Sequence, residues 1–302
     1  MNRDYSDVLI EGPWEHEFVS AHGGRFHVVT AGQASTRPLV VLLHSTPLFW
    51  WQWRHVIPAL TEAGYRVAAM DMRGTGASDK PPSGYDQITL TRDVAGVIRS
   101  LGARNAVIVG HGLGAITAWS MPALQPAVTR GVAALSAPHP ARLHASLRAS
   151  LHKRPVSRLA GLGIPSLGER RIARANTVSL VFDHLGHQPV PGQIVDVYAN
   201  ALRIPFAARG SLEPLRWYAR GMPTPLGRRY VQAIRTGISV PALQLHGAHD
   251  GLLRREVIAA DSMALCMNLR FEMISDAGFF LTEEAPDTVN DLLVDWLGKS
   301  FE

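Results

Sequence analysis

Short apolar runs alternate with amphipathic stretches through the first half of the chain. The runs 38–43 (PLVVLL), 65–70 and 106–109 are mostly aliphatic without polar alternation, which is typical of parallel strands buried on both faces. The stretches 91–101 and 113–124 have helical periodicity. This alternation predicts an α/β fold with a mostly parallel central sheet flanked by helices.

The first two strands have a different pattern. The runs 14–21 and 26–30 flank the turn 22–24, which contains two glycines, and they predict an antiparallel hairpin at an edge of the sheet. The remaining elements follow from the same periodicities: strands over 131–135, 241–245 and 269–274, and helices over 50–63 and 286–297.

The strand pattern is interrupted in the middle of the chain. Residues 138–238 contain helical pieces cut by prolines and glycines, with no clear buried strand. We interpret this segment as a helical cap inserted into the fold. The core is then discontinuous and comprises residues 1–137 and 239–302.

Composition and charge exclude several classes of function. Of 302 residues, 46% are hydrophobic and 18% charged, which suits a globular protein with a sizeable core. The formal net charge of +5 comes with no groove-reading motif, so we expect no nucleic-acid partner. Cys266 is the only cysteine, which excludes an intrachain disulfide and favours a reducing cytoplasm. Residues 1–17 have no apolar signal core, and no run reaches membrane-spanning length.

The stretch 106–115 (AVIVGHGLGA) is the centre of the predicted site. A buried strand, a corner of alternating glycines and a helix form the pattern called a nucleophile elbow. The turn is so tight that its flanking residues must be small, and it holds the central residue at positive φ with its side chain in the pocket. That residue should be Ser, Asp or Cys. Here it is Gly112, which has no side chain to attack a substrate.

Four further stretches carry a resemblance to a known family. They are 42–60 (LLHSTPLFWWQWRHVIPAL), 71–81 (DMRGTGASDKP), 203–220 (RIPFAARGSLEPLRWYAR) and 278–289 (GFFLTEEAPDTV). With the elbow, they make the chain similar to the α/β hydrolases of the epoxide hydrolase and haloalkane dehalogenase branch over nearly its whole length. The resemblance implies the α/β-hydrolase fold with an inserted helical cap.

The resemblance also assigns three catalytic roles by position. The nucleophile falls on Gly112, the acid on Asp250 and the catalytic histidine on Phe279. Glycine cannot form an ester and a phenyl ring cannot transfer a proton, so the family's covalent hydrolysis is predicted to be absent. We expect no metal and no cofactor.

Several residues near this vestigial triad have two interpretations. Asp250 is either a lone general base or a solvated remnant at a strand end, and we favour the remnant. His111 precedes the elbow centre and is expected to pack into the core. Of His246 and His249, His249 is the better candidate for a substitute base, although a solvent-facing histidine is its default interpretation.

The resemblance places an oxyanion hole at the backbone N–H groups of Thr46 and Leu113, which do not depend on side chains. His44 is expected to support this loop, and Ser45 replaces the glycine of the family. Trp50, from the same segment, is expected at the pocket.

The cap carries further family positions. Epoxide hydrolases have two cap tyrosines that donate to the epoxide oxygen; Tyr218 matches one, and Arg158 stands near where the other should lie. Trp217 and Tyr218 are pocket residues or, equally, packing residues.

Basic residues concentrate in the first part of the cap. The span 139–174 contains seven arginines, and Glu169 is its only acidic residue. Leu143, Leu147 and Leu151 recur every four residues and predict a basic amphipathic helix. We favour a helix that covers the core over one that binds a membrane surface.

These observations lead to one preferred function and two alternatives. The preferred function is a triad-deficient protein that binds a small apolar molecule between core and cap. The first alternative is a lyase, isomerase or cyclase that uses the oxyanion cradle and Asp250. The second is residual epoxide or ester hydrolysis through a substitute base.

Overall fold

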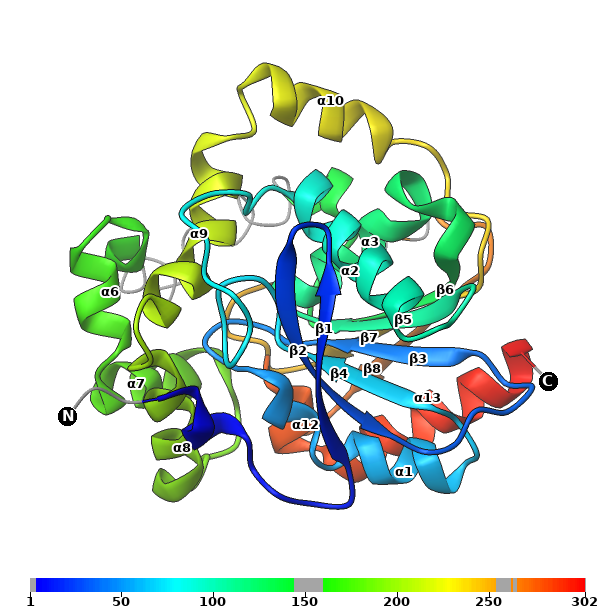
Figure 1. Ribbon diagram of the computed structural model, residues 1–302, viewed down its shortest axis with the longest axis horizontal. Helices are drawn as coiled ribbons and strands as arrows, with labels where there is room; N and C mark the ends of the chain where they lie inside the picture. The colour runs from blue at the N-terminus through cyan, green and yellow to red at the C-terminus, as the bar shows by residue number, and fades with distance from the viewer. Residues whose placement is uncertain (1–3, 144–159, 254–261, 263–264, 302) are drawn as a thin grey trace.

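The computed structural model describes residues 4–143, 160–253, 262 and 265–301 and contains an eight-stranded sheet (Figure 1). Its spatial order is β1-β2-β4-β3-β5-β6-β7-β8; the pairs β1–β2 and β2–β4 are antiparallel, and all the other neighbouring pairs are parallel. The strands are β1 (Glu15–Ala21), β2 (Gly24–Ala31), β3 (Leu39–Leu43), β4 (Val67–Met70), β5 (Ala106–His111), β6 (Thr129–Leu135), β7 (Ala242–Gly247) and β8 (Leu269–Ile274). The predicted edge hairpin and mostly parallel sheet are confirmed.

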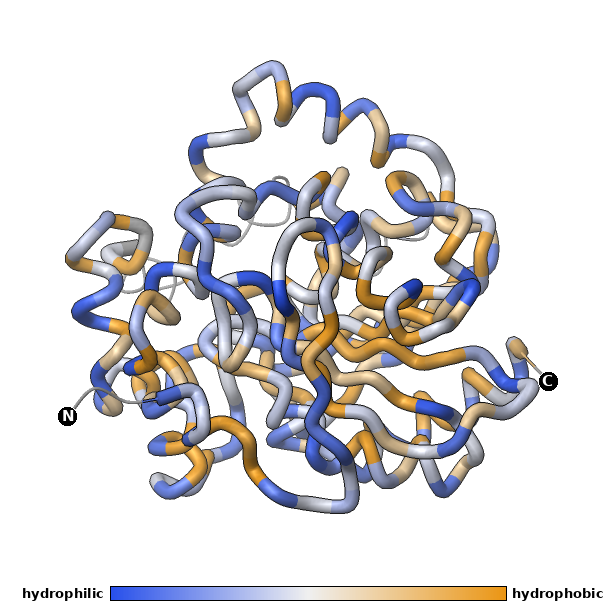
Figure 2. Tube along the Cα trace, viewed as in Figure 1, coloured by the Kyte–Doolittle hydropathy of each residue, from blue (hydrophilic) through white to orange (hydrophobic). Residues whose placement is uncertain are grey.

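Helices cover both faces of the sheet, as predicted. Helices α1 (Val56–Glu62) and α13 (Pro286–Phe301) lie on one side, and α2 (Gln87–Ser100) and α3 (Leu113–Leu124) lie on the other (Figure 1). Successive residues of a strand point to opposite faces. In β3, Val40 therefore packs in the core with α1 and α13, whereas Val41 packs in the core with α2 and α3. Figure 2 shows the hydrophobic strands enclosed between these layers.

Two predicted helices differ from the structure at their beginnings. The expected helix over 50–63 is divided into a 3₁₀ turn, η2 (Trp50–Trp53), and α1. Three residues per turn align Trp50 with Trp53, and both indoles are buried. Helix α2 begins four residues earlier than predicted because Asp86 caps it, accepting from the Thr89 backbone N–H at 3.0 Å.

The described chain between β6 and β7 contains helices joined by loops and no strand, with one isolated β-bridge between Ile238 and Cys266. Its helices are η4 (Ala160–Gly163), α6 (Leu167–Ile172), α7 (Ala175–Leu185), α8 (Gly192–Leu202), α9 (Ala207–Arg220) and α10 (Pro225–Ala233). The cap boundaries 138 and 238 remain a prediction. Leu147, Leu151 and Arg158 lie in 144–159, outside the described residues, as does most of the predicted basic helix. No helix in the described ranges is long and apolar enough to cross a membrane.

Three short elements complete the described fold. Two 3₁₀ turns precede β1 and β6, and one short helix follows β8: η1 (Tyr5–Val8), η3 (Pro126–Val128) and α12 (Leu281–Glu284). The sequence analysis did not predict α12. This helix begins two residues after Phe279 and carries two acidic residues, Glu283 and Glu284.

Candidate functional site

The predicted elbow is present between β5 and α3. Gly112 joins them with φ +51° and ψ −113°, a conformation that glycine adopts without a Cβ penalty. The two flanking glycines leave no room for side chains. A Cβ on Gly110 would lie 2.3 Å from the Gly114 carbonyl oxygen, and one on Gly114 would lie 2.2 Å from that of Leu43. The corner therefore has the geometry that the sequence predicted.

The space that a side chain at position 112 would need is already occupied. A Cβ on Gly112 would lie 2.2 Å from Ser45 Oγ, 3.0 Å from Ser45 Cβ and 2.8 Å from Phe279 Cζ. Ser45 belongs to the loop that follows β3, and its hydroxyl lies where the elbow side chain would begin. Sequence analysis noted Ser45 as a departure from the family glycine but did not connect it with Gly112.

Phe279 lies at the cavity wall with its side chain almost fully buried. Its carbonyl oxygen accepts hydrogen bonds from His111 Nε2 and Ser136 Oγ, each at 2.7 Å. Burial lowers the pKa of His111 to about 4, so the ring is neutral at pH 7 and donates from Nε2. His111 is thus a packed histidine, as predicted, and it positions the Phe279 backbone.

Glu284, in α12, fixes the loop that carries Phe279. Its carboxylate accepts from the backbone N–H groups of His187 (2.7 Å), Gln188 (3.0 Å), Gly278 (2.8 Å) and Phe280 (2.9 Å). Charge-assisted bonds of this kind are stronger than bonds between neutral groups. This carboxylate joins the chain before α8 to the chain after β8, and sequence analysis missed this link because His187 and Gln188 are distant from Glu284 along the chain.

Asp250 lies in the loop after β7 but not on the cavity wall. Its Oδ1 accepts from the backbone N–H groups of Leu252 (2.6 Å) and Leu253 (2.9 Å), and its Oδ2 lies 3.1 Å from His246 Nε2. Both side chains are almost fully buried, so Asp250 is not the solvated remnant that the sequence analysis favoured. His249 is exposed, as its default interpretation predicted, and it stacks on His187 with ring centroids 3.9 Å apart. The histidine that lies beside the Asp250 carboxylate is therefore His246.

A cavity of about 350 Å³ lies over the elbow, between the sheet and the inserted helices. This volume is within the range of small-molecule sites. None of the described residues that line it is charged, and only Ser45, Thr46, Ser136 and Tyr218 bring polar side chains. Apolar side chains form the rest of the wall: Pro47, Leu113, Ile116, Ala137, Leu143, Leu162, Ile172, Val181, Leu185, Leu212, Leu215, Leu252, Leu253 and Phe279.

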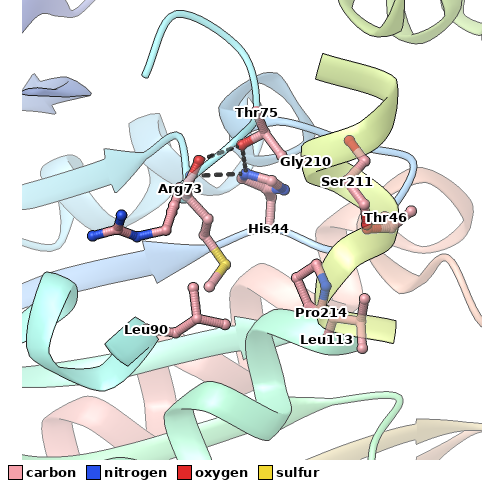
Figure 3. Close-up of a pocket in the computed structure, with 10 residues that line it drawn as sticks. His44, Thr46, Arg73, Thr75, Leu90, Leu113, Gly210, Ser211 and Pro214 are labelled. Carbon is pink, nitrogen blue, oxygen red and sulfur yellow. Dashed lines mark hydrogen bonds between the residues drawn. The ribbon is translucent and has the colours of Figure 1, made fainter. Parts of the chain in front are cut away.

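The predicted oxyanion loop is held from behind by His44. Its Nδ1 donates to the Ser45 carbonyl at 3.0 Å. Its Nε2 accepts from the Met72 backbone N–H at 3.1 Å and lies 2.9 Å from Thr75 Oγ1 (Figure 3). Burial lowers the pKa of His44, which keeps the ring neutral. This arrangement fits the supporting role expected for His44.

Thr46 and Leu113 lie between the large cavity and a much smaller one of about 20 Å³, which has room for about one water molecule (Figure 3). The Thr46 hydroxyl donates to the Ser211 carbonyl of α9 at 2.8 Å. Both residues whose backbone N–H groups were predicted as the oxyanion hole thus line the cavity beside Gly112.

Tyr218 reaches the cavity, but its hydroxyl is part of a buried chain of hydrogen bonds. Ser120 donates to the Ile116 carbonyl at 2.7 Å, so it accepts from Tyr230, 2.9 Å away. Because Tyr230 donates its proton to Ser120, its hydroxyl oxygen accepts from Tyr218 at 2.8 Å. Burial raises the pKa of both phenols, which keeps them protonated. The Tyr218 proton therefore points along this chain.

Two tryptophans expected at the pocket lie elsewhere. Trp50 is fully buried, donates from Nε1 to the Val8 carbonyl at 2.9 Å and packs edge-on against Trp14. Trp217 is half-buried and packs edge-on against Tyr218 and Tyr230, with ring centroids 5.1 and 5.3 Å apart. Neither lines the cavity, so both are packing residues.

Comparison with known proteins places the chain in a family. A family model described as the alpha/beta hydrolase fold matches residues 38–286. The AB hydrolase superfamily protein YfhM of Bacillus subtilis is 28% identical over 288 residues, which cover 93% of this chain and 97% of YfhM. Epoxide hydrolase 3 of Xenopus tropicalis is 28% identical over 291 residues, which cover 92% of this chain and 76% of that protein.

A solved structure agrees with these likenesses. Epoxide hydrolase A from Mycobacterium thermoresistibile superimposes with a TM-score of 0.77 and 27% identity, covering 96% of this chain and 99% of that one. The fold class and the resemblance predicted from sequence are therefore confirmed. The chain belongs to the α/β hydrolase fold family, in its epoxide hydrolase-like branch.

Proposed function

We propose that this protein binds a small, largely apolar molecule in the 350 Å³ cavity and does not hydrolyse it by the covalent route of its family. One observation carries the proposal. At the elbow and at the position of the family's histidine, the cavity wall presents Gly112 and Phe279. Neither residue can attack a substrate or move a proton.

The remaining polar groups give little support to a repurposed enzyme. Asp250 is absent from the cavity wall, and its carboxylate is engaged with two backbone amides and lies beside His246. The Tyr218 proton is directed to Tyr230 rather than into the cavity. A general base and a general acid would each have to leave an existing partner before they acted on a ligand.

The inserted helices favour enclosure of the ligand. Leu162, Ile172 and Leu212 come from η4, α6 and α9, and they face the elbow across the cavity. We propose that residues 138–238 act as a cap whose apolar surface encloses the apolar body of the ligand. Removal of such a surface from water contributes about 25 cal/mol per Å², from which the costs of association and ordering are subtracted.

The first test is native mass spectrometry of small molecules that co-purify with the protein, combined with turnover assays on an aryl epoxide and a p-nitrophenyl ester. We expect a bound apolar compound and no turnover above a heat-denatured control. Turnover that persists through repeated purification, and is lost with Asp250→Asn, would overturn the proposal and favour the repurposed enzyme.

A further inference from the structure

We propose that Ser45 has replaced the elbow residue as the polar anchor of the cavity and that the ligand is a neutral carbonyl compound with an apolar body. This inference rests on the proposed function, because it names the ligand class of the same cavity. Ser45 Oγ lies 2.2 Å from the Cβ position of the elbow residue, so its hydroxyl occupies the space where an elbow side chain would begin.

The Ser45 hydroxyl is buried, and its own hydrogen bonds are weak. It lies 3.4 Å from the Thr46 carbonyl oxygen and 3.4 Å from the Leu113 backbone nitrogen. Good hydroxyl hydrogen bonds are about 2.7–2.8 Å long. A ligand atom in the cavity can therefore receive this proton without displacing a strong partner.

The backbone of Ser45 is firmly held, which fixes the direction of its side chain. The Ser45 N–H donates to Gln52 Oε1 at 2.9 Å, and the Ser45 carbonyl accepts from His44 Nδ1 at 3.0 Å. Both partners are buried. The hydroxyl is thus presented to the cavity by a positioned loop, and little ordering cost remains for the protein when a ligand binds.

The other hydroxyls on the wall have already used their protons. Ser136 donates to the Phe279 carbonyl at 2.7 Å, and Thr46 donates to Ser211 at 2.8 Å. Tyr218 donates to Tyr230 at 2.8 Å. Each hydroxyl has one proton, so among the described lining side chains Ser45 is the one with a proton free for a ligand. A group that only accepts hydrogen bonds fits this site.

Charge narrows the ligand class further. No described lining residue carries a charge that could balance a carboxylate or an ammonium group, and burying such an ion unpaired is costly. A neutral oxygen acceptor avoids that cost. A ketone or ester carbonyl also places its oxygen beside the Thr46 and Leu113 backbones, the positions from which the family's oxyanion hole is predicted.

The experiment compares three probes of nearly equal shape by isothermal titration calorimetry. They are 4-phenyl-2-butanone, the hydrocarbon (3-methylbutyl)benzene and the anion 3-phenylpropanoate. Each is titrated into the wild-type protein and into Ser45→Ala, which removes only the hydroxyl. The matched control is Ser78→Ala, a buried serine outside the cavity whose hydroxyl bonds to the Asp71 carbonyl at 2.7 Å.

We expect the ketone to bind the wild type more tightly than the hydrocarbon, and Ser45→Ala to weaken ketone binding roughly threefold to tenfold, the effect of one net hydrogen bond. Hydrocarbon binding should change less than about twofold, which shows an intact cavity. Ser78→Ala should leave the ratio of the two affinities unchanged, and the anion should bind more weakly than the ketone.

The outcomes separate the two proposals. If ketone and hydrocarbon bind equally well, and Ser45→Ala changes neither, the anchor is refuted while the apolar binding function stands. Binding of the anion as tightly as the ketone would also refute the neutral ligand class. If no probe binds a folded wild-type protein, the proposed function itself fails, and the inference fails with it.

Discussion

The contact between positions 45 and 112 predicts that substitutions at these positions are strongly coupled. Gly112→Ala places a Cβ 2.2 Å from Ser45 Oγ and 2.8 Å from Phe279 Cζ, and it forces a side-chain residue into φ +51°. Backbone strain of this kind costs about 1–3 kcal/mol. Overpacking of a buried site costs about 1–3 kcal/mol more. The free energy of unfolding should therefore fall by about 2–6 kcal/mol.

Ser45→Gly removes both Ser45 atoms in this contact and leaves only the strain and the Phe279 contact. The double variant, Gly112→Ala with Ser45→Gly, should therefore be more stable than the sum of the single effects by up to the overpacking cost of about 1–3 kcal/mol. Urea denaturation of the wild type, the two single variants and the double variant forms a double-mutant cycle that measures this coupling directly. Equal m-values across the four proteins are required for the comparison.

Gly102→Ala is the matched control because Gly102 has φ +75° but no atom within 4 Å of its Cβ position. It should cost only the backbone strain and show no coupling to Ser45→Gly. If the effects at positions 45 and 112 add within about 0.5 kcal/mol, as for independent sites, the contact is not as described. The conclusion that Ser45 fills the space of the elbow side chain would then be refuted.

Three further predictions concern the loops around the elbow. Folding lowers the pKa of His111 from about 6.5 to about 4, so below pH 6.5 the unfolded chain binds more protons than the folded protein and the free energy of unfolding falls as the pH falls. His111→Gln should reduce this loss by up to about 1.4 kcal/mol per pH unit, measured by urea denaturation at pH 7 and pH 5. Glu284→Gln should lower the free energy of unfolding by about 1–3 kcal/mol, because four backbone amides lose a charged acceptor; a loss below 0.5 kcal/mol would contradict this role. Gly112→Asp with Phe279→His should form a covalent substrate adduct, seen by intact-mass spectrometry, only when Ser45→Gly is also present; an adduct without Ser45→Gly would contradict the steric argument.

The parts of the fold that local patterns determine were predictable from sequence. The bounds of α3 and β8 match the prediction because each is a continuous apolar or periodic run that begins beside a turn residue. The start of α2 was missed because the Asp86 cap lies before the apolar periodicity begins. The interruption after Trp53 was missed because an apolar run alone does not distinguish a 3₁₀ turn from an α-helix.

The site was predictable only in part, because its decisive contacts join distant segments. The family resemblance assigned Gly112, Asp250 and Phe279 by position, but only the structure shows that Asp250 lies beside His246. Likewise, the tryptophan segment matched a family motif, yet Trp50 packs away from the cavity. Sequence position therefore identifies candidate groups, whereas side-chain direction and partner choice depend on packing across the fold.

The residues at positions 45 and 112 are best understood as one change in the site. With glycine at both positions, the base of the cavity would lack the atoms that Ser45 now supplies, and lost packing is destabilising. With side chains at both, Ser45 Oγ would lie 2.2 Å from the elbow Cβ. If the ancestor had the family's nucleophile at position 112 and glycine at position 45, loss of the nucleophile had to precede the gain of Ser45. On the proposal made above, Ser45 supplies both packing and a hydroxyl beside the elbow, so the cavity has a polar contact for a ligand although Gly112 has no side chain.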